Sequence, residues 1–525
     1  MAEPEAAKTF KAIEAELKRR KARADQEYRQ FEPDFREAYS FCLPHRVLPG
    51  TQTDTRPETA DTFTTLGEEV TTDFASDMAD TFTPEHLPWA NVEVATVVPQ
   101  EIADDVKAAV DKESKVIFDA VRSSGFHEAC KRGNKDLSIS AFGLAIEDDG
   151  APEPFRCQVI PIPELRILRD HRGGVGTRLW VRDMMAEDIY ADFPDLWDMV
   201  PAPVKEARRK NSSTKFCVVQ GCYRDYSVRA ETAWIKCTMV HDKLLTWDRK
   251  VGVGSANIIV FRWDPDTMFA WGNGPNLKAL GDYRELDETA YLKMKGMARQ
   301  VDPPLAYPDD GVINLDGGLP NGVAIPMLGG SEIQVIESTH PIDIAFYATK
   351  DVEDRIRRHL YLDEPRQEGK TPPTLGQWMD ESIRRQRRLG TPAAPIWPEG
   401  LFESFMRFRW LLVQRGTLKP FLPVGKMELP IRPENPLKRA AQQEEAAASL
   451  RYLESVGALF GPEALAMSVD VGKTMHKLKE QSQATAVELP SADAINQNFQ
   501  QMQQATMAAH AAKAIGQAGG AAQAA

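Results

Sequence analysis

Residues 271–304 read WGNGPNLKALGDYRELDETAYLKMKGMARQVDPP and predict one long helix with sharp ends. Gly274 and Pro275 form its start, because a proline at the first helical position gives up only a hydrogen bond that would be unmade anyway. Pro303 and Pro304 end it, since proline cannot continue a helix. At 1.5 Å per residue, about 25 residues span roughly 37 Å.

The apolar residues of this helix form a narrow stripe. They recur at spacings of three and four and are Ala279, Tyr283, Leu286, Ala290, Met294 and Met297. Such a stripe is typical of a seam between helices rather than of a helix lying broadly on a core. It would pack either against copies of itself or on the β-rich part of its own chain, and periodicity favours neither.

A second helix is expected after a β-rich excursion. Residues 305–340 are rich in glycine, proline and short apolar runs, which predicts strands and turns. Pro341 then suits the first turn of a helix. That helix has a four-residue apolar stripe made of Ala348, Val352, Ile356 and Leu360. Two long helices joined by a compact β excursion form a stalk with a small head.

The composition is that of an ordinary soluble globular protein, with 42% hydrophobic and 27% charged residues among 525. At roughly 150 residues per domain, the length predicts about three to four domains. No run of about 18 apolar residues suggests a membrane span. The charged, helical N-terminus lacks the apolar core of a signal peptide, so we expect synthesis to end in a bacterial cytosol, with no membrane partner.

Other helices and strands follow from the same patterns. Helices are expected over 6–40, bent or broken near Pro33, and over 65–82 and 101–125. Short β-branched and aromatic runs between 155 and 262 predict an antiparallel meander, interrupted by a helix at 185–195 and a linker at 201–211. C-terminal helices are expected from Thr374 to Gly390, onward to Gly416, and over 436–457 and 462–480.

Glycine clusters at 172–178 and 251–257 superficially match nucleotide-binding loops. Both lie between strand-like runs and neither opens a helix, so hairpin turns are the better interpretation. His241 and Asp242 are interpreted as a polar hairpin pair. The DPDT run at 264–267 is interpreted as a turn rather than a metal site.

The sequence contains no recognisable catalytic motif. It has no phosphate-binding loop, no zinc-protease motif, no nucleophile elbow and no carboxylates at metal-binding spacing. Its six cysteines have no zinc-like spacing and are expected to be reduced, buried thiols. We therefore expect no enzyme, no cofactor and no metal, although an enzyme such as a nuclease or transferase, whose residues meet only in the fold, stays open. The net charge of −13 argues against tight wrapping of nucleic acid but allows sliding contact.

The segment from 272 to 304 resembles the signature segment of the head-to-tail connector, or portal, proteins of short-tailed bacteriophages. That family has a similar G-x-GP, a following Ala-Leu-x-Asp and a closing Pro-Pro. The matching residues here are Gly272, Gly274, Pro275, Ala279, Leu280, Asp282, Pro303 and Pro304. Residues 19–44, the Arg-rich helix after Thr374 and residues 434–460 are also similar, in order, across about 15–480. The chain departs from the family at 371–377, TPPTLGQ, where a Thr-Ala-x-Glu-like helix start is usual, so the ends of the preceding loop are not fixed.

The resemblance implies an α+β portal fold with a mixed helix and antiparallel-β wing, a two-helix stem, a small α/β clip and a helical crown. The implied wing covers 1–270, β-rich at 155–262, together with long helices and a linker at 374–435. The stem helices are 271–300 and 342–362, joined by the clip at 301–341. A channel loop follows at 363–373, then crown helices at 436–490 and an Ala/Gln-rich tail at 491–525 that is either ordered or disordered.

The resemblance also implies a ring, typically a dodecamer, at one capsid vertex of the virion. DNA is packaged through it by the large terminase subunit and later ejected, and tail adaptors bind the same end. Major capsid and scaffolding proteins are further partners, with assembly in the host bacterial cytoplasm. A non-conducting structural protein of the head or tail is the alternative.

The resemblance also implies which residues contact DNA, neighbouring subunits and partner proteins. DNA-backbone contacts are expected from the channel loop at Arg366, Gln367 and Lys370, and from the stem at Lys293, Lys295 and Arg299. Solvated charges or inter-subunit ion pairs are the alternative for the charged residues. Stem packing is assigned to Tyr283, Leu286, Ala290, Met294, Met297, Val352, Ile356 and Leu360. The clip surface for terminase or adaptor is assigned to Val323, Ile325, Met327, Ile333 and Val335, for which a local core is the alternative.

Overall fold

The chain forms two compact units, Met1–Pro433 and Glu434–Ala525. The computed structural model describes residues 5–46, 62–92, 100–148, 150, 155–227, 232–301, 303, 305–308, 324–327, 334–335, 342–362, 388–419, 431–433, 448–455, 458, 470–482, 489–490, 494–498 and 501. The described part of the second unit is mostly helical and includes α13 (Val471–Ser482). The first unit contains helices and mostly antiparallel sheets, which makes the fold mixed α+β.

Four helices open the first unit. They are α1 (Glu5–Cys42), α2 (Leu66–Phe82), α3 (Gln100–Ser123) and α4 (Phe126–Leu137). Of the bend or break expected near Pro33, the break is wrong, because α1 is continuous through this proline. Tyr28 and Phe35, on either side of Pro33, both pack against Trp271, with ring centroids 5.8 and 5.1 Å apart. Burial of these rings offsets the roughly 3 kcal/mol that an internal proline costs a helix.

The main sheet is a five-stranded antiparallel meander in the order β4-β5-β6-β7-β8. Its strands are β4 (Leu165–Arg169), β5 (Val175–Met185), β6 (Lys215–Asp225), β7 (Ala233–Val240) and β8 (Lys243–Val251). His241 and Asp242 form the β7–β8 turn with φ of 46° and 60°, as the hairpin interpretation predicted. The first glycine cluster likewise turns the chain between β4 and β5, where the Asp170 N–H donates to Gly174 O at 2.8 Å.

A second, three-stranded sheet corrects the expectation of one meander over 155–262. Its order is β3-β2-β9, with β2 (Ala141–Glu147) between β3 (Arg156–Ile160) and β9 (Ile258–Arg262). No strand was expected at β2, because nearly all of AFGLAIE is buried and its sequence therefore has no alternation of apolar and polar residues. The second glycine cluster therefore carries the chain from β8 to another sheet, and its interpretation as a hairpin turn is wrong.

Short helices cap one end of the meander. They are α5 (Ala186–Asp192), the 3₁₀ turn η2 (Trp197–Met199) and α6 (Ala202–Arg209), with another 3₁₀ turn, η1 (Ile162–Glu164), before β4. The helix expected at 185–195 is confirmed by α5. The linker expected at 201–211 is wrong, since α6 forms there with Val204 and Ala207 buried against the sheet end.

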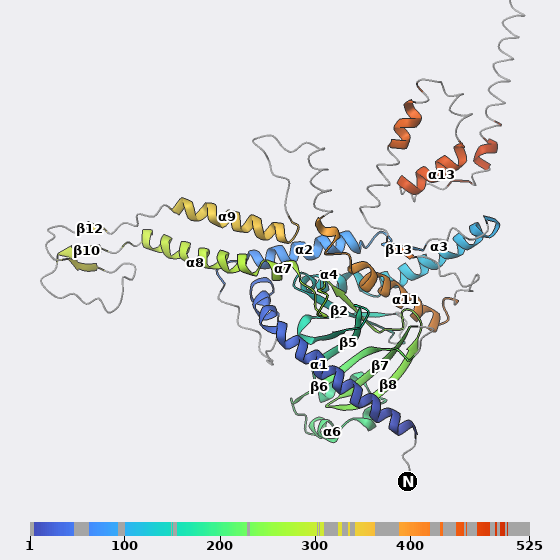
Figure 1. Ribbon diagram of the computed structural model, residues 1–525, viewed down its shortest axis with the longest axis horizontal. Coiled ribbons are helices and arrows are strands. Elements are labelled where there is room, and N and C mark those ends of the chain that lie inside the picture. Colours follow the sequence, from blue (N-terminus) through green and yellow to red (C-terminus); the bar gives the residue numbers. More distant parts are fainter. Residues whose placement is uncertain are drawn as a thin grey trace, which may run out of the picture. The chain divides into compact units, whose positions relative to one another are not determined.

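The remaining elements of the first unit extend outward or close over the sheets (Figure 1). The outward part consists of α7 (Pro275–Lys278), α8 (Leu280–Val301), β10 (Leu305–Pro308), β11 (Ala324–Met327), β12 (Gln334–Val335) and α9 (Ile342–His359). The π-helix η3 (Ile396–Leu401) and α11 (Phe402–Gln414) return to the sheets, and β13 (Ile431–Pro433) pairs with β1 (Ala90–Val92). The expected helix–β–helix order is confirmed, with β10 central and parallel to β11.

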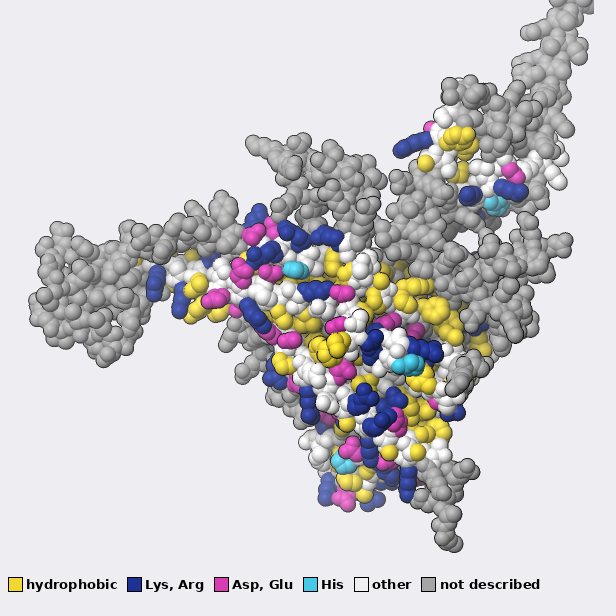
Figure 2. Space-filling view, viewed as in Figure 1, with side chains coloured by type: hydrophobic (Ala, Val, Ile, Leu, Met, Phe, Trp, Pro, Cys, Tyr) yellow, Lys and Arg dark blue, Asp and Glu magenta, His cyan; other side chains and the backbone are white. Residues whose placement is uncertain are grey.

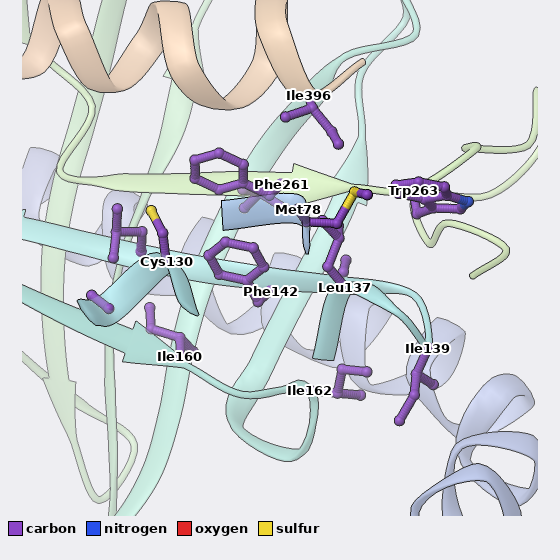
Figure 3. Packing of buried hydrophobic residues seen from close by; sticks show 14 of the residues in the cluster. Met78, Cys130, Leu137, Ile139, Phe142, Ile160, Ile162, Phe261, Trp263 and Ile396 are labelled. Atoms are coloured by element: carbon purple, nitrogen blue, oxygen red, sulfur yellow. The ribbon is translucent and has the colours of Figure 1, made fainter. Parts of the chain in front are cut away.

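The core of the small sheet is a stacked pair of rings, Phe142 on β2 and Phe261 on β9 (Figure 3). Their centroids are 4.6 Å apart and their planes differ by 4°. A Cβ atom on Gly133 of α4 would lie 2.4 Å from the Phe142 ring, and one on Gly400 of η3 would lie 2.3 Å from the Phe261 ring. Two glycines thus let α4 and η3 approach the ring pair closely.

We predict that Gly133→Ala and Gly400→Ala each lower the free energy of unfolding by about 1–3 kcal/mol, because the added methyl overpacks the ring pair. Gly281→Ala is the matched control, since a Cβ there meets no atom within 4 Å. Its free energy of unfolding should rise by up to about 1 kcal/mol, since alanine is the better helix former. Urea unfolding followed by tryptophan fluorescence measures all three, and core variants indistinguishable from the control would contradict the packing argument.

Candidate functional site

The outward helices begin where two glycines bring backbone against backbone. A Cβ atom on Gly274 would lie 2.2 Å from the carbonyl oxygen of Ile139, and one on Gly272 would lie 2.2 Å from that of Trp263. The space saved allows the Gly274 N–H to donate to Ile139 O at 2.9 Å, and Ser140 Oγ to donate to Gly272 O at 2.8 Å. The sequence motif G-x-GP is therefore the attachment of α7 and α8 to the end of α4 and the start of β2.

Asn276 adds a buried polar contact to this attachment. Its side-chain amide nitrogen donates to Thr71 Oγ1 at 2.9 Å and to Ser138 Oγ at 2.8 Å, and its amide oxygen accepts from the Tyr283 hydroxyl at 2.8 Å. Asn276 has no exposed surface, so all of these bonds are shielded from water. Asn276 was not among the residues predicted from the sequence, because an asparagine after a proline has no periodicity that marks it as buried.

The helices α8 and α9 lie side by side and run antiparallel (Figure 1). We call the pair the helical hairpin. Near its attachment, Tyr283 and Leu286 of α8, Val352 and Ile356 of α9, and Leu360 directly after α9 are all buried in the main core of the first unit. Ala279, at the junction of α7 and α8, is buried there too, and Leu280 is almost so. The expected single helix is interrupted at Ala279, although the Tyr283 N–H still bonds Ala279 O at 3.0 Å.

Ion pairs reinforce this base of the hairpin. Arg355 Nε lies 3.1 Å from Asp282 Oδ1, and His359 Nε2 lies 3.3 Å from Asp282 Oδ2. Arg284 of α8 pairs with Glu37 of α1, and its hydrogen bond holds the pKa of that carboxyl below its usual value. The Asp282 of the sequence motif therefore joins the two helices to each other.

The far half of α8 has a different environment. Ala290 is half-buried, whereas the next apolar side chains are exposed: 57% for Leu292, 51% for Met294, 48% for Met297 and 87% for Val301. The predicted stripe is thus divided, with one end inside its own chain and the other presented to solvent. The regular spacing of the apolar residues could not show that one end of the stripe is buried and the other exposed.

The candidate stem charges lie on this exposed half. Lys295 Nζ is 4.6 Å from the centre of the Tyr291 ring, which in turn packs 4.9 Å from Phe63. Arg299 is exposed, and Lys293 is half-buried with an interaction partner. Lys295 and Arg299 are four residues apart and share one face of α8, whereas Lys293, two residues before Lys295, lies on a different face.

Several predicted positions have no described side chain. Arg366, Gln367, Lys370, Pro304, Val323 and Ile333 lie outside the described residues. Ile325 and Met327 are in β11 and Val335 is in β12, with only their backbone described, and Pro303 is half-buried.

No metal or membrane feature occurs in the described part of the chain. It contains no group of three or more His, Cys, Asp or Glu side chains able to hold a metal ion. Likewise, none of the described helices has the length and apolarity needed to cross a membrane. The cysteines are free and at least half-buried, as predicted, and burial raises the pKa of the Cys42 thiol to about 12.

Comparison with known proteins gives one family. The sequence profile described as "Bacteriophage head to tail connecting protein" matches residues 14–486, which is most of the chain. No curated protein matches the chain significantly. The profile spans the attachment, the helical hairpin and all four sheets of the described residues.

We predict that Asn276→Ala lowers the free energy of unfolding by about 1–3 kcal/mol, because it leaves the buried Tyr283 hydroxyl without its acceptor. Asn273→Ala, three residues earlier and exposed, should change it by less than about 0.5 kcal/mol. Hydrogen exchange of the α8 amides should also become faster in Asn276→Ala alone. Equal behaviour of the two variants would show that the amide does not hold the attachment.

Proposed function

We propose that this chain, which belongs to the family of bacteriophage head to tail connecting proteins, forms the portal ring through which DNA enters and leaves the capsid. Membership makes it a structural protein of the virion at the junction of head and tail. The observation that carries the finer proposal is the exposed apolar half of α8.

The divided stripe supports assembly from copies of the chain. A hairpin fixed at its base by burial and ion pairs can present a rigid surface at its far end. Burying the exposed part of each large apolar side chain there would contribute about 1 kcal/mol per residue. Because the same surface recurs on each copy, side-by-side packing with a constant rotation can close into a ring, for which the family resemblance suggests a dodecamer.

The charge distribution supports sliding DNA. A conduit must not hold its cargo, and each phosphate contact strengthens binding, so few contacts are wanted. The net charge of −13 meets that requirement. We assign the backbone contacts to Lys293, Lys295 and Arg299 and to the loop residues Arg366, Gln367 and Lys370, without base readout, since packaging must ignore sequence.

The other parts receive roles from the same proposal. The wing comprises 1–270 and 374–435, the clip 301–341, the channel loop 363–373 and the crown 436–490. The clip strands would meet the large terminase subunit and later the tail adaptors, through Val323, Ile325, Met327, Ile333 and Val335. Capsid and scaffolding proteins would contact the ring from outside during assembly in the host cytoplasm.

Electron microscopy of the purified protein tests the proposal. We expect rings with an axial hole from the natural chain, and mainly small oligomers from Met294→Ser combined with Met297→Ser, which removes apolar surface from the far half of α8. Glu288→Gln, an exposed change on the same helix, should leave rings intact.

Other outcomes are equally informative. Oligomers without a hole would favour a non-conducting structural protein of the head or tail. A natural chain that stays monomeric at all concentrations would contradict ring formation. Intact rings from the double methionine variant would show that the exposed stripe is not the interface.

Replacing both Arg366 and Lys370 by alanine tests the channel loop. We expect normal rings but altered DNA packaging or retention, because two candidate phosphate contacts are lost. Packaging assays with purified rings, motor and proheads measure this effect. Loss of ring assembly instead would mean that the loop is structural.

A further inference from the structure

Four arginines converge on a hollow of about 90 Å³ between α1 and the β4–β5 turn. Arg19, Arg20 and Arg23 come from α1, and Arg169 comes from the end of β4, with His171 beside them. We call this the arginine hollow. Figure 2 shows Lys and Arg side chains gathered over the region where α1 crosses the main sheet. Such a concentration is unexpected in a chain whose net charge is −13.

The carboxylate inside the hollow already has partners. Asp170 Oδ1 accepts from the backbone N–H groups of Arg172 at 2.8 Å and Gly174 at 2.9 Å. Its Oδ2 accepts from the Tyr226 hydroxyl at 2.7 Å, and Arg224 Nη1 lies 3.9 Å away. Asp170 therefore shapes the β4–β5 turn, and its single negative charge can offset only one of the four arginines that line the hollow.

A second carboxylate, Glu16, holds two of the arginines in place. Its oxygens accept from Arg19 Nε at 2.9 Å and from Arg20 Nε at 2.7 Å. Arg20 also donates to Thr177 Oγ1 at 2.8 Å, and its guanidinium lies 4.6 Å from the centre of the Tyr223 ring. The single negative charge of Glu16 is thus shared by Arg19 and Arg20. The contacts of Arg20 also fix the orientation of its side chain.

The other two arginines lack such a partner. Neither Arg23 nor Arg169 forms a salt bridge with any residue that the structure describes. Glu27 acts electrostatically on Arg23 but accepts a hydrogen bond from the Ala270 N–H at 2.6 Å. Both arginines are exposed beside the hollow. The cations gathered here exceed the carboxylates that could neutralise them.

We propose that the arginine hollow binds a phosphate group. Guanidinium groups present parallel N–H donors that match phosphate oxygens, and an anion would relieve their mutual repulsion. The fixed Arg20 and the Asp170-supported turn give the hollow a shape before the anion arrives. A DNA backbone phosphate is the source that rests on the proposed function, and it would contact the chain away from both the stem and the channel loop. Free phosphate is the other source of the same chemistry.

The test compares Arg23→Gln combined with Arg169→Gln against a control of equal charge, Arg29→Gln combined with Lys131→Gln. Both control residues are exposed and lie outside the hollow. Calorimetry with inorganic phosphate and anisotropy with a 30-bp duplex are measured on the full-length protein. We expect at least ten-fold weaker phosphate binding in the hollow variant alone. We also expect its log–log salt slope for DNA to fall by up to about 1.8, at about 0.9 per lost contact.

The possible outcomes distinguish a DNA phosphate from free phosphate, and they distinguish this proposal from the proposed function. Loss of both affinities identifies the DNA backbone, and loss of phosphate affinity alone identifies free phosphate. No difference from the control, or no binding by the natural chain, overturns the proposal. Loss of ring assembly in the hollow variant also overturns it, because the hollow would then hold a carboxylate of a neighbouring copy. A natural chain that binds phosphate but forms no ring contradicts the proposed function and leaves this site standing.

Discussion

The close backbone contact at Gly272 and Gly274 determines how the rest of this molecule is used. Any side chain there would overlap the carbonyl oxygens of Trp263 and Ile139, so only glycine lets α7 begin directly against β2 and the end of α4. The direction of α8 follows from that contact and from the Asn276 amide beside it. The direction of a helix that begins at such an attachment is set by backbone hydrogen bonds. Their geometry is more restricted than that of side-chain packing.

Buried arginine pairs hold the opposite side of the same core. Arg178 of β5 donates to Glu403 of α11 at 2.9 Å, and Arg262 of β9 donates to Glu399 of η3 at 2.8 Å. Because a buried guanidinium without a partner is strongly destabilising, these pairs fix where η3 and α11 can lie. Together with Gly400 against the Phe261 ring, they close the segment after the hairpin onto the sheets. The hairpin therefore leaves from, and returns to, a rigid base.

The proposed ring and the arginine hollow depend on this rigidity in different ways. The far half of α8 can meet a neighbouring copy only if its near half stays fixed by Tyr283, Leu286 and Val352. The hollow lies on the long helix α1, whose passage through Pro33 is maintained by Tyr28 and Phe35 against Trp271. Since Trp271 directly precedes Gly272, α1 and the hairpin share one anchoring point.

The sequence by itself determined the long helices, the strands of the meander, the helix–β–helix order of the hairpin and the resemblance to the connector family. These features depend on local periodicity, on proline and glycine, and on motif spacing, which act within a few residues. The tertiary structure alone decided that β2 joins β3 and β9 in a separate sheet, that α1 continues through Pro33, and that one apolar stripe on α8 is half buried and half exposed. It also brought arginines about 150 residues apart, Arg19, Arg20 and Arg23 on one side and Arg169 on the other, to one hollow. Each of these outcomes depends on contacts between distant segments, whose burial and charge outweigh local preference and leave no pattern in the neighbouring residues.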